Sequence, residues 1–240
     1  MISSSHRLIY IHIPKTGGNS VQELLLPLSD DRKVSGGPRD GIERFEVEGV
    51  ITPNKHATLA DYAEKLGDVS GFNIVATIRN PIERAVSYYF SPHRWKSQAG
   101  DGSWSIARPT WDLKRFVAML PEVKPTADFL KIRGRIATGI NFLRFDNLSA
   151  DFAELVTKLN LPVSVRLAHR NKSASDEDFV SQVLADPGVK AAVKRRFAED
   201  LELFRALPAW TMFISAVAYW SVEFCTDLSC VGLLGKSARG

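Results

Sequence analysis

The chain contains little cysteine. Of its 240 residues, only Cys225 and Cys230 are cysteines. Two thiols are too few for a disulfide framework or a cysteine-rich zinc site, and no other cluster of metal ligands stands out. Neither sign of charge dominates, because 31 basic residues against 27 acidic ones leave a net charge of +4. This mild basic excess suits an anionic ligand and does not require nucleic acid.

Long hydrophobic runs are scarce as well. The apolar stretch at residues 209–224 is short for a transmembrane helix, which needs about 20 apolar residues, so it favours a buried or interface helix. The alternative is a membrane-associating tail with interfacial Trp and Tyr. No signal peptide precedes the first predicted strand, so a cytoplasmic protein is expected. We predict one main domain over residues 1–207 and a hydrophobic tail over residues 208–240, whose role stays open.

The remaining sequence predicts an α/β fold. Apolar, β-branched runs indicate strands at residues 8–13, 73–78 and 142–145. Helical patterns lie between them, at residues 21–26, 59–66 and from Pro81 onward. This alternation favours a central parallel sheet flanked by helices, with a ligand at the carboxyl ends of the strands.

Lys15 follows the first predicted strand, in the segment Pro14-Lys15-Thr16-Gly17-Gly18-Asn19-Ser20. A turn between a strand and a helix binds anions, because backbone N–H groups and the positive end of the helix dipole meet there. Gly17 and Gly18 can adopt positive φ and admit a ligand oxygen. The usual triphosphate loop has its lysine after the glycines. The order here predicts a phosphate-like group held without an obligatory metal, the alternative being a plain tight turn.

A second motif surrounds Arg79, in Arg79-Asn80-Pro81-Ile82-Glu83-Arg84-Ala85-Val86-Ser87-Tyr88-Tyr89. Arg79 ends a predicted strand, and Pro81 suits the first turn of a helix. Arg79 and the hydroxyl of Ser87 can jointly bind a second phosphate. The alternative is that Arg79 is a surface residue and Ser87 has no role.

Together these two motifs resemble the cofactor signatures of sulfotransferases that use 3′-phosphoadenosine 5′-phosphosulfate (PAPS). The similarity is greatest to the carbohydrate (heparan/chondroitin-type) branch, and it covers residues 8 to about 205. It continues in four further segments, at residues 55–58, 143–148, 169–173 and 196–204. Asn19 departs from the threonine that members commonly carry, but asparagine keeps hydrogen-bonding groups.

The resemblance implies a P-loop-like three-layer α/β fold and a set of site residues. Arg79 and Ser87 would hold the 3′ phosphate, and no metal is expected. Lys15 would stabilise the negative charge that grows on the leaving oxygen. The residues that would hold the 5′ phosphosulfate are Lys15, Thr16, Gly17, Gly18, Asn19 and Ser20.

His56 is the candidate for the base that deprotonates the acceptor hydroxyl. It lies in a short polar connection, its imidazole titrates near neutrality if unperturbed, and the resemblance places the base in this segment. The alternative is a loop histidine that merely caps a backbone carbonyl. Asp61, one helical turn further on, could orient His56 or replace it.

Three other histidines rank below His56. We expect His12 to pack near the Lys15 turn, and His93 could instead face the acceptor. His169 lies in a late polar segment that could close over the nucleotide, the alternative being a solvated loop.

Two long connections would frame an acceptor groove, at residues 30–49 and 91–110. The second combines cations and aromatic rings suited to sugars and anionic groups, namely Arg94, Trp95, Lys96, Trp104 and Arg108. The alternative is a solvated loop anchored by its two tryptophans.

These features predict transfer of a sulfuryl group to a hydroxyl of a carbohydrate or glycoconjugate. Three alternatives remain: transfer to a non-carbohydrate alcohol, phenol or lipid, nucleotide binding without turnover, and a P-loop kinase. The kinase is disfavoured because the lysine is in the wrong place and no acidic partner for magnesium stands out.

Overall fold

The computed structural model describes residues 1–34, 46–107, 109–166 and 177–207. The chain divides into two compact units, Met1–Phe204 and Arg205–Gly240. The predicted tail at residues 208–240 lies outside the described residues, as do both cysteines. Every helix in the described part of the chain is too short or too polar to traverse a lipid bilayer.

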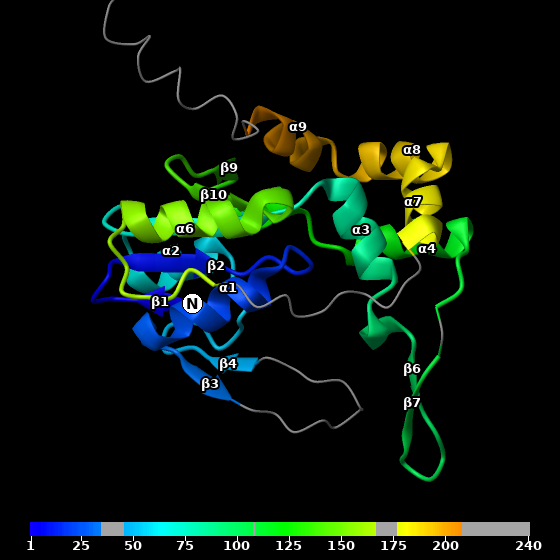
Figure 1. Ribbon diagram of the computed structural model, residues 1–240, viewed down its shortest axis with the longest axis horizontal. Coiled ribbons are helices and arrows are strands. Elements are labelled where there is room, and N and C mark those ends of the chain that lie inside the picture. The colour runs from blue at the N-terminus through cyan, green and yellow to red at the C-terminus, as the bar shows by residue number, and fades with distance from the viewer. Residues whose placement is uncertain (35–45, 108, 167–176, 208–240) are drawn as a thin grey trace, which may run out of the picture. The chain divides into compact units, whose positions relative to one another are not determined.

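A four-stranded sheet lies at the centre of the first unit (Figure 1). Its strands have the order β1-β2-β5-β10. The three parallel strands confirm the predicted ones: β2 (Leu8–Ile11), β5 (Asn73–Ile78) and β10 (Asn141–Arg144). The edge strand β1 (Ile2–Ser3) is antiparallel to β2. The sheet is therefore mixed, whereas the sequence predicted a parallel one. A strand of two residues is too short to produce a periodic pattern.

Helices cover both faces of this sheet. Along β2, Leu8 and Tyr10 enter one buried cluster and Ile9 enters another, because successive strand residues point to opposite faces. The helices in the first cluster are α1 (Gly18–Leu25) and α6 (Leu148–Lys158). Those in the second are α2 (Leu59–Leu66) and α5 (Thr126–Leu130). The result is the predicted arrangement of a central sheet between helices.

A third buried cluster is helical and centres on Tyr89 at the end of α3. The ring of Tyr89 lies 5.1 Å from Phe90, 5.5 Å from Trp95 and 5.1 Å from Trp111, centroid to centroid. The helices that supply this cluster are α3 (Pro81–Tyr89), α4 (Leu113–Met119), α7 (Glu177–Ala185) and α8 (Pro187–Arg196). The last helix, α9 (Ala198–Ala206), follows α8 after Phe197.

The remaining elements are short. Three antiparallel pairs are β3 (Arg32–Val34) with β4 (Glu46–Glu48), β6 (Lys96–Gln98) with β7 (Trp104–Ile106), and β8 (Lys131–Ile132) with β9 (Arg135–Ile136). The 3₁₀ turns are η1 (Leu26–Leu28), η2 (Pro92–Arg94), η3 (Leu120–Glu122) and η4 (Phe145–Asn147).

The predicted excursion at residues 91–110 is a hairpin in the structure, and part of its side-chain set is structural. Trp95 is buried and donates its indole N–H to the Tyr89 carbonyl at 2.8 Å. Arg94 pairs with Glu122. Lys96 and Trp104 remain closer to solvent, with the ammonium 4.9 Å from the ring centroid. Arg108 lies outside the described residues.

Candidate active site

Residues 14–20, which we call the Lys15 loop, join β2 to α1. Lys15 has φ of 69° and Gly17 has φ of 82°, both in the left-handed region. The buried Thr16 hydroxyl donates to the Ile13 carbonyl at 2.8 Å and lies 2.7 Å from the Thr77 hydroxyl of β5. Because the Thr16 side chain points into the protein, only its backbone can face a ligand.

The two glycines of the Lys15 loop are required for different reasons. Gly17 has positive φ, and a Cβ there would lie 2.9 Å from a ring carbon of Phe145. A Cβ on Gly18 would lie 2.8 Å from the His12 ring and from the Tyr10 hydroxyl. Real Cβ atoms do not approach other atoms this closely, so the fold itself demands glycine at both positions.

The N-terminus of α1 carries no compensating negative charge. Its N-cap is Gly17, which offers no side-chain cap, and its first turn contains no acidic residue. Asn19 and Ser20 are half-buried in this first turn. The first N–H groups and the helix dipole therefore keep their capacity for an anion.

Lys15 and Arg79 are electrostatic neighbours. Burial lowers the pKa of Lys15, and the charge of Arg79 lowers it further. Arg79 follows β5 and donates to Glu83 at 3.2 Å, with its guanidinium carbon 4.0 Å from the centroid of the Phe145 ring. The two cations thus follow the ends of adjacent parallel strands.

Ser87 lies on α3, the helix that begins after Arg79. The Asn80 side chain caps this helix by accepting from the Ile82 N–H at 2.9 Å. Ser87 is half-buried, and its hydroxyl makes no hydrogen bond within the described residues. Its role in binding a phosphate stays a prediction.

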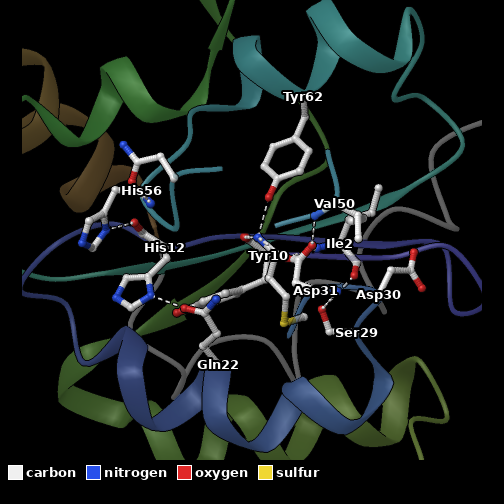
Figure 2. A network of polar contacts seen from close by, with 12 residues as sticks. Ile2, Tyr10, His12, Gln22, Ser29, Asp30, Asp31, Val50, His56 and Tyr62 are labelled. Carbon is white, nitrogen blue, oxygen red and sulfur yellow. Dashed lines mark hydrogen bonds and ion pairs between the residues drawn. The ribbon is translucent and has the colours of Figure 1, made fainter. Parts of the chain in front are cut away.

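His56 lies beside the strand that leads into the Lys15 loop (Figure 2). Its Nδ1 is 2.9 Å from the carbonyl oxygen of His12, and the two rings meet edge to face with centroids 4.8 Å apart. Since a carbonyl only accepts, Nδ1 carries the proton and Nε2 keeps a free lone pair. Nε2 is the atom that can accept a proton from a substrate.

The expectation that His56 titrates near neutrality is wrong for this environment. Burial lowers its pKa to about 4, the hydrogen bond to the His12 carbonyl offsets part of that effect, and the charges of Lys55 and Arg84 lower it further. His56 is therefore neutral at pH 7.

Asp61 does not orient His56. Its carboxylate accepts from the backbone N–H of Thr58 at 2.7 Å and from the Thr58 hydroxyl at 2.8 Å. The Thr58 hydroxyl in turn accepts from the Asp61 N–H, which completes a capping box at the start of α2. The His12 carbonyl orients His56 instead, so the expected orienting role of Asp61 is corrected.

The other histidines differ in their surroundings. His12 is buried against the Lys15 loop, as predicted, and its Nδ1 is hydrogen-bonded to Oε1 of Gln22. Burial lowers the pKa of His12 well below its ordinary value. His93 is exposed in η2. His169 lies outside the described residues.

Arg84 has a structural role that was not predicted from the sequence. Its Nε donates to the Pro14 carbonyl at 3.0 Å, Nη2 donates to the Lys124 carbonyl at 2.9 Å, and Nη1 lies 3.8 Å from Asp200. Arg84 thereby fixes the residue before Lys15. Its position on the apolar face of the predicted helix was the available indication, because a buried charge needs partners.

Comparison with known families gives one match, to the N-terminal part of the chain. Residues 1–117 match the model of the sulfotransferase family. This part of the chain is therefore similar to sulfotransferases. The matched segment contains the Lys15 loop, His56, Arg79 and Ser87. The family match supports a transferase, and it confirms the resemblance at the level of the family. No curated protein and no solved structure matches the chain.

Proposed function

We propose that the chain transfers the sulfuryl group of PAPS to a hydroxyl of a carbohydrate or glycoconjugate. One observation carries the proposal: Lys15 and Arg79 follow the adjacent parallel strands β2 and β5, next to the start of α1, which has no side-chain cap. The charge of Arg79 also lowers the pKa of Lys15. Two partly buried cations in one region favour a ligand with more than one negative group.

The donor groups fit a bisphosphorylated nucleotide of the kind that sulfotransferases generally use. The first N–H groups of α1 and the Lys15 ammonium would hold the 5′ end. Arg79 and the hydroxyl of Ser87 would hold the 3′ phosphate, which distinguishes this cofactor from ATP. When bound, PAPS supplies the sulfuryl group and its phosphate leaving group.

The chain itself would supply a cation and a base. Lys15 would place its ammonium where negative charge develops on the leaving oxygen. His56 would accept the hydroxyl proton at Nε2, which is unprotonated at pH 7. A pKa of about 4 makes the base weak in the empty protein, and a nearby anion raises that pKa.

The acceptor class rests on the hairpin of β6 and β7. Trp104 is 39% exposed, and Lys96 lies over its ring, a combination suited to a sugar ring with anionic substituents. A non-carbohydrate alcohol, a phenol or a lipid is the alternative acceptor. We also propose a cytoplasmic location, with no nucleic-acid partner and with residues 208–240 as the segment for any membrane association.

Calorimetry with two nucleotides tests the cofactor. We expect 3′-phosphoadenosine 5′-phosphate to bind more tightly than adenosine 5′-phosphate. Arg79→Ala should weaken binding of 3′-phosphoadenosine 5′-phosphate at least about tenfold, because a hydrogen bond to a charged group contributes about 1.5–3 kcal/mol. The same substitution should change the Kd for adenosine 5′-phosphate by less than about twofold. Arg32→Ala, at an exposed arginine of β3, is the matched control.

Transfer of labelled sulfate then separates an enzyme from a binding protein. Lys15→Ala should abolish transfer to a panel of sugar, phenol and alcohol acceptors while the chain stays folded. Equal losses of affinity for both nucleotides in Arg79→Ala would show that Arg79 does not bind the 3′ phosphate. Tight nucleotide binding without transfer to any acceptor would favour nucleotide binding without turnover.

A further inference from the structure

The proposed base is held by a neighbouring histidine and not by a carboxylate. The His12 carbonyl accepts the Nδ1 proton of His56, and the His12 ring packs edge to face against the His56 ring (Figure 2). Both contacts come from the residue three positions before Lys15. The orientation of His56 therefore depends on how His12 is fixed.

Gln22 fixes His12. It lies on α1, one helical turn after Gly18, and its Oε1 is hydrogen-bonded to Nδ1 of His12. The side chain of Gln22 is wholly buried, and His12 is only 4% exposed. The close approach of the His12 ring to Gly18 holds the ring from a second side. His12 thus has one orientation between β2 and α1.

The burial of Gln22 is costly for the fold. Its Nε2 is buried and has no hydrogen-bond partner within the described residues. A buried, unpaired amide donor costs about 1–3 kcal/mol, and an apolar side chain of the same size would avoid that cost. Such an apolar side chain would, however, lose the hydrogen bond between Nδ1 of His12 and Oε1 of Gln22.

Burial and nearby positive charge both disfavour protonation of the two rings. Burial is the largest cause for each, the charge of Lys55 lowers the pKa of both histidines, and that of Arg84 lowers the pKa of His56. His12 is buried and its Nδ1 is committed to Gln22, so we assign it the role of positioning its neighbour.

We propose that Gln22 and His12 are positioning residues that fix the ring orientation of His56. Gln22 accepts the Nδ1 proton of His12 and so holds the ring that packs against His56. The backbone carbonyl of His12 accepts the Nδ1 proton of His56 and so sets its tautomer, which leaves Nε2 of His56 free. The ring contact connects the base to α1, the helix whose N-terminus would bind the anion. The inference rests on the proposed function.

Nitrogen NMR of the full chain labelled with ¹⁵N-histidine tests this proposal without any ligand. The chemical shifts of the two ring nitrogens report which one is protonated. We expect His56 to carry its proton on Nδ1 at pH 7 in the wild-type protein. A proton on Nε2 of His56 in the wild type would overturn the proposal without any substitution.

Substitutions at position 22 extend the test. Gln22→Leu removes the acceptor of the His12 Nδ1 proton, so the His12 ring that packs against His56 is no longer fixed. The ring-nitrogen shifts of His56 should change, while its proton stays on Nδ1 because the His12 carbonyl remains. If the chain transfers sulfate, its kcat should fall about tenfold to a hundredfold, the loss expected for a misplaced catalytic group, while the Kd for 3′-phosphoadenosine 5′-phosphate stays within about twofold. Gln22→Glu keeps an oxygen in the same place and should preserve kcat.

Glu23→Leu, at the neighbouring position of α1, is the control and should leave the ring-nitrogen shifts of His56 unchanged. If Gln22→Leu does not fold, His12→Asn replaces it, because asparagine keeps an N–H for Gln22 but removes the ring that packs against His56. Unchanged His56 shifts and an unchanged kcat in a folded variant would overturn the inference alone. Changed His56 shifts in a protein that transfers no sulfate would support the positioning and refute the proposed enzyme.

Discussion

At the scale of single residues, the surroundings of His56 decide its protonation. Burial and two nearby cations act in the same direction, and only the bond to the His12 carbonyl opposes them. The lone pair on Nε2 is consequently available over the whole neutral range. A histidine with an ordinary pKa would be partly protonated below pH 7.

This shift predicts the pH dependence of catalysis. A general base works unprotonated, so kcat/KM for PAPS falls as pH drops through the pKa of the free enzyme. We expect that fall near pH 4, and not near the ordinary histidine value of 6.5. The acid limb of kcat should lie at a higher pH, because a bound anion raises the pKa of His56. Initial rates from about pH 3 to about pH 8 measure both limbs, and a kcat/KM limb near the ordinary histidine value would contradict the assignment.

At the scale of elements, Arg84 joins helices to the Lys15 loop. Besides pairing with Arg84, Asp200 of α9 accepts from the N–H groups of Thr126 and Ala127 at 2.7 and 2.9 Å, and so caps α5. Burial lowers the pKa of Arg84 to about 10, which leaves it charged at pH 7. One buried ion pair therefore connects α3, α5, α9 and the carbonyl before Lys15.

Removal of the Arg84 guanidinium should be severe. Arg84→Met leaves Asp200 buried without its cation and the Pro14 carbonyl without its donor, so the free energy of unfolding should fall by about 3–5 kcal/mol. Arg94→Met is the matched control, because Glu122 is exposed, and we expect it to cost only about 0–1 kcal/mol. Urea denaturation measures both values. Equal losses would show that the Arg84 pair contributes no more than a surface pair.

At the scale of the whole molecule, the sequence was informative wherever one segment forms an element by itself. The strand β2 is a continuous apolar run and β5 is largely apolar. The helix α2 has the predicted bounds, because its capping box and periodicity are both local. Contacts between distant segments could not be predicted. Gln22 meets His12 and Arg84 meets Pro14 only after the sheet and helices have packed.

The predicted division of the chain has its own test. The buried residues of the three core clusters lie between Met1 and Leu201, inside the first unit. A chain that ends at Leu207 should therefore keep its melting temperature within about 2 °C, which corresponds to less than about 1 kcal/mol for a domain of this size. Differential scanning calorimetry measures the shift. An unfolded or aggregated truncation would show that residues 208–240 belong to the same folding unit.

The contacts of Gly18 have an evolutionary consequence. A methyl group at position 18 would overlap both the imidazole at position 12 and the hydroxyl at position 10, so alanine at position 18 is costly while both rings are present. Homologues should therefore carry alanine there only where smaller side chains replace both. The three sites should consequently covary, and the loss of both rings from a lineage should be accompanied by relaxed selection for the glycine.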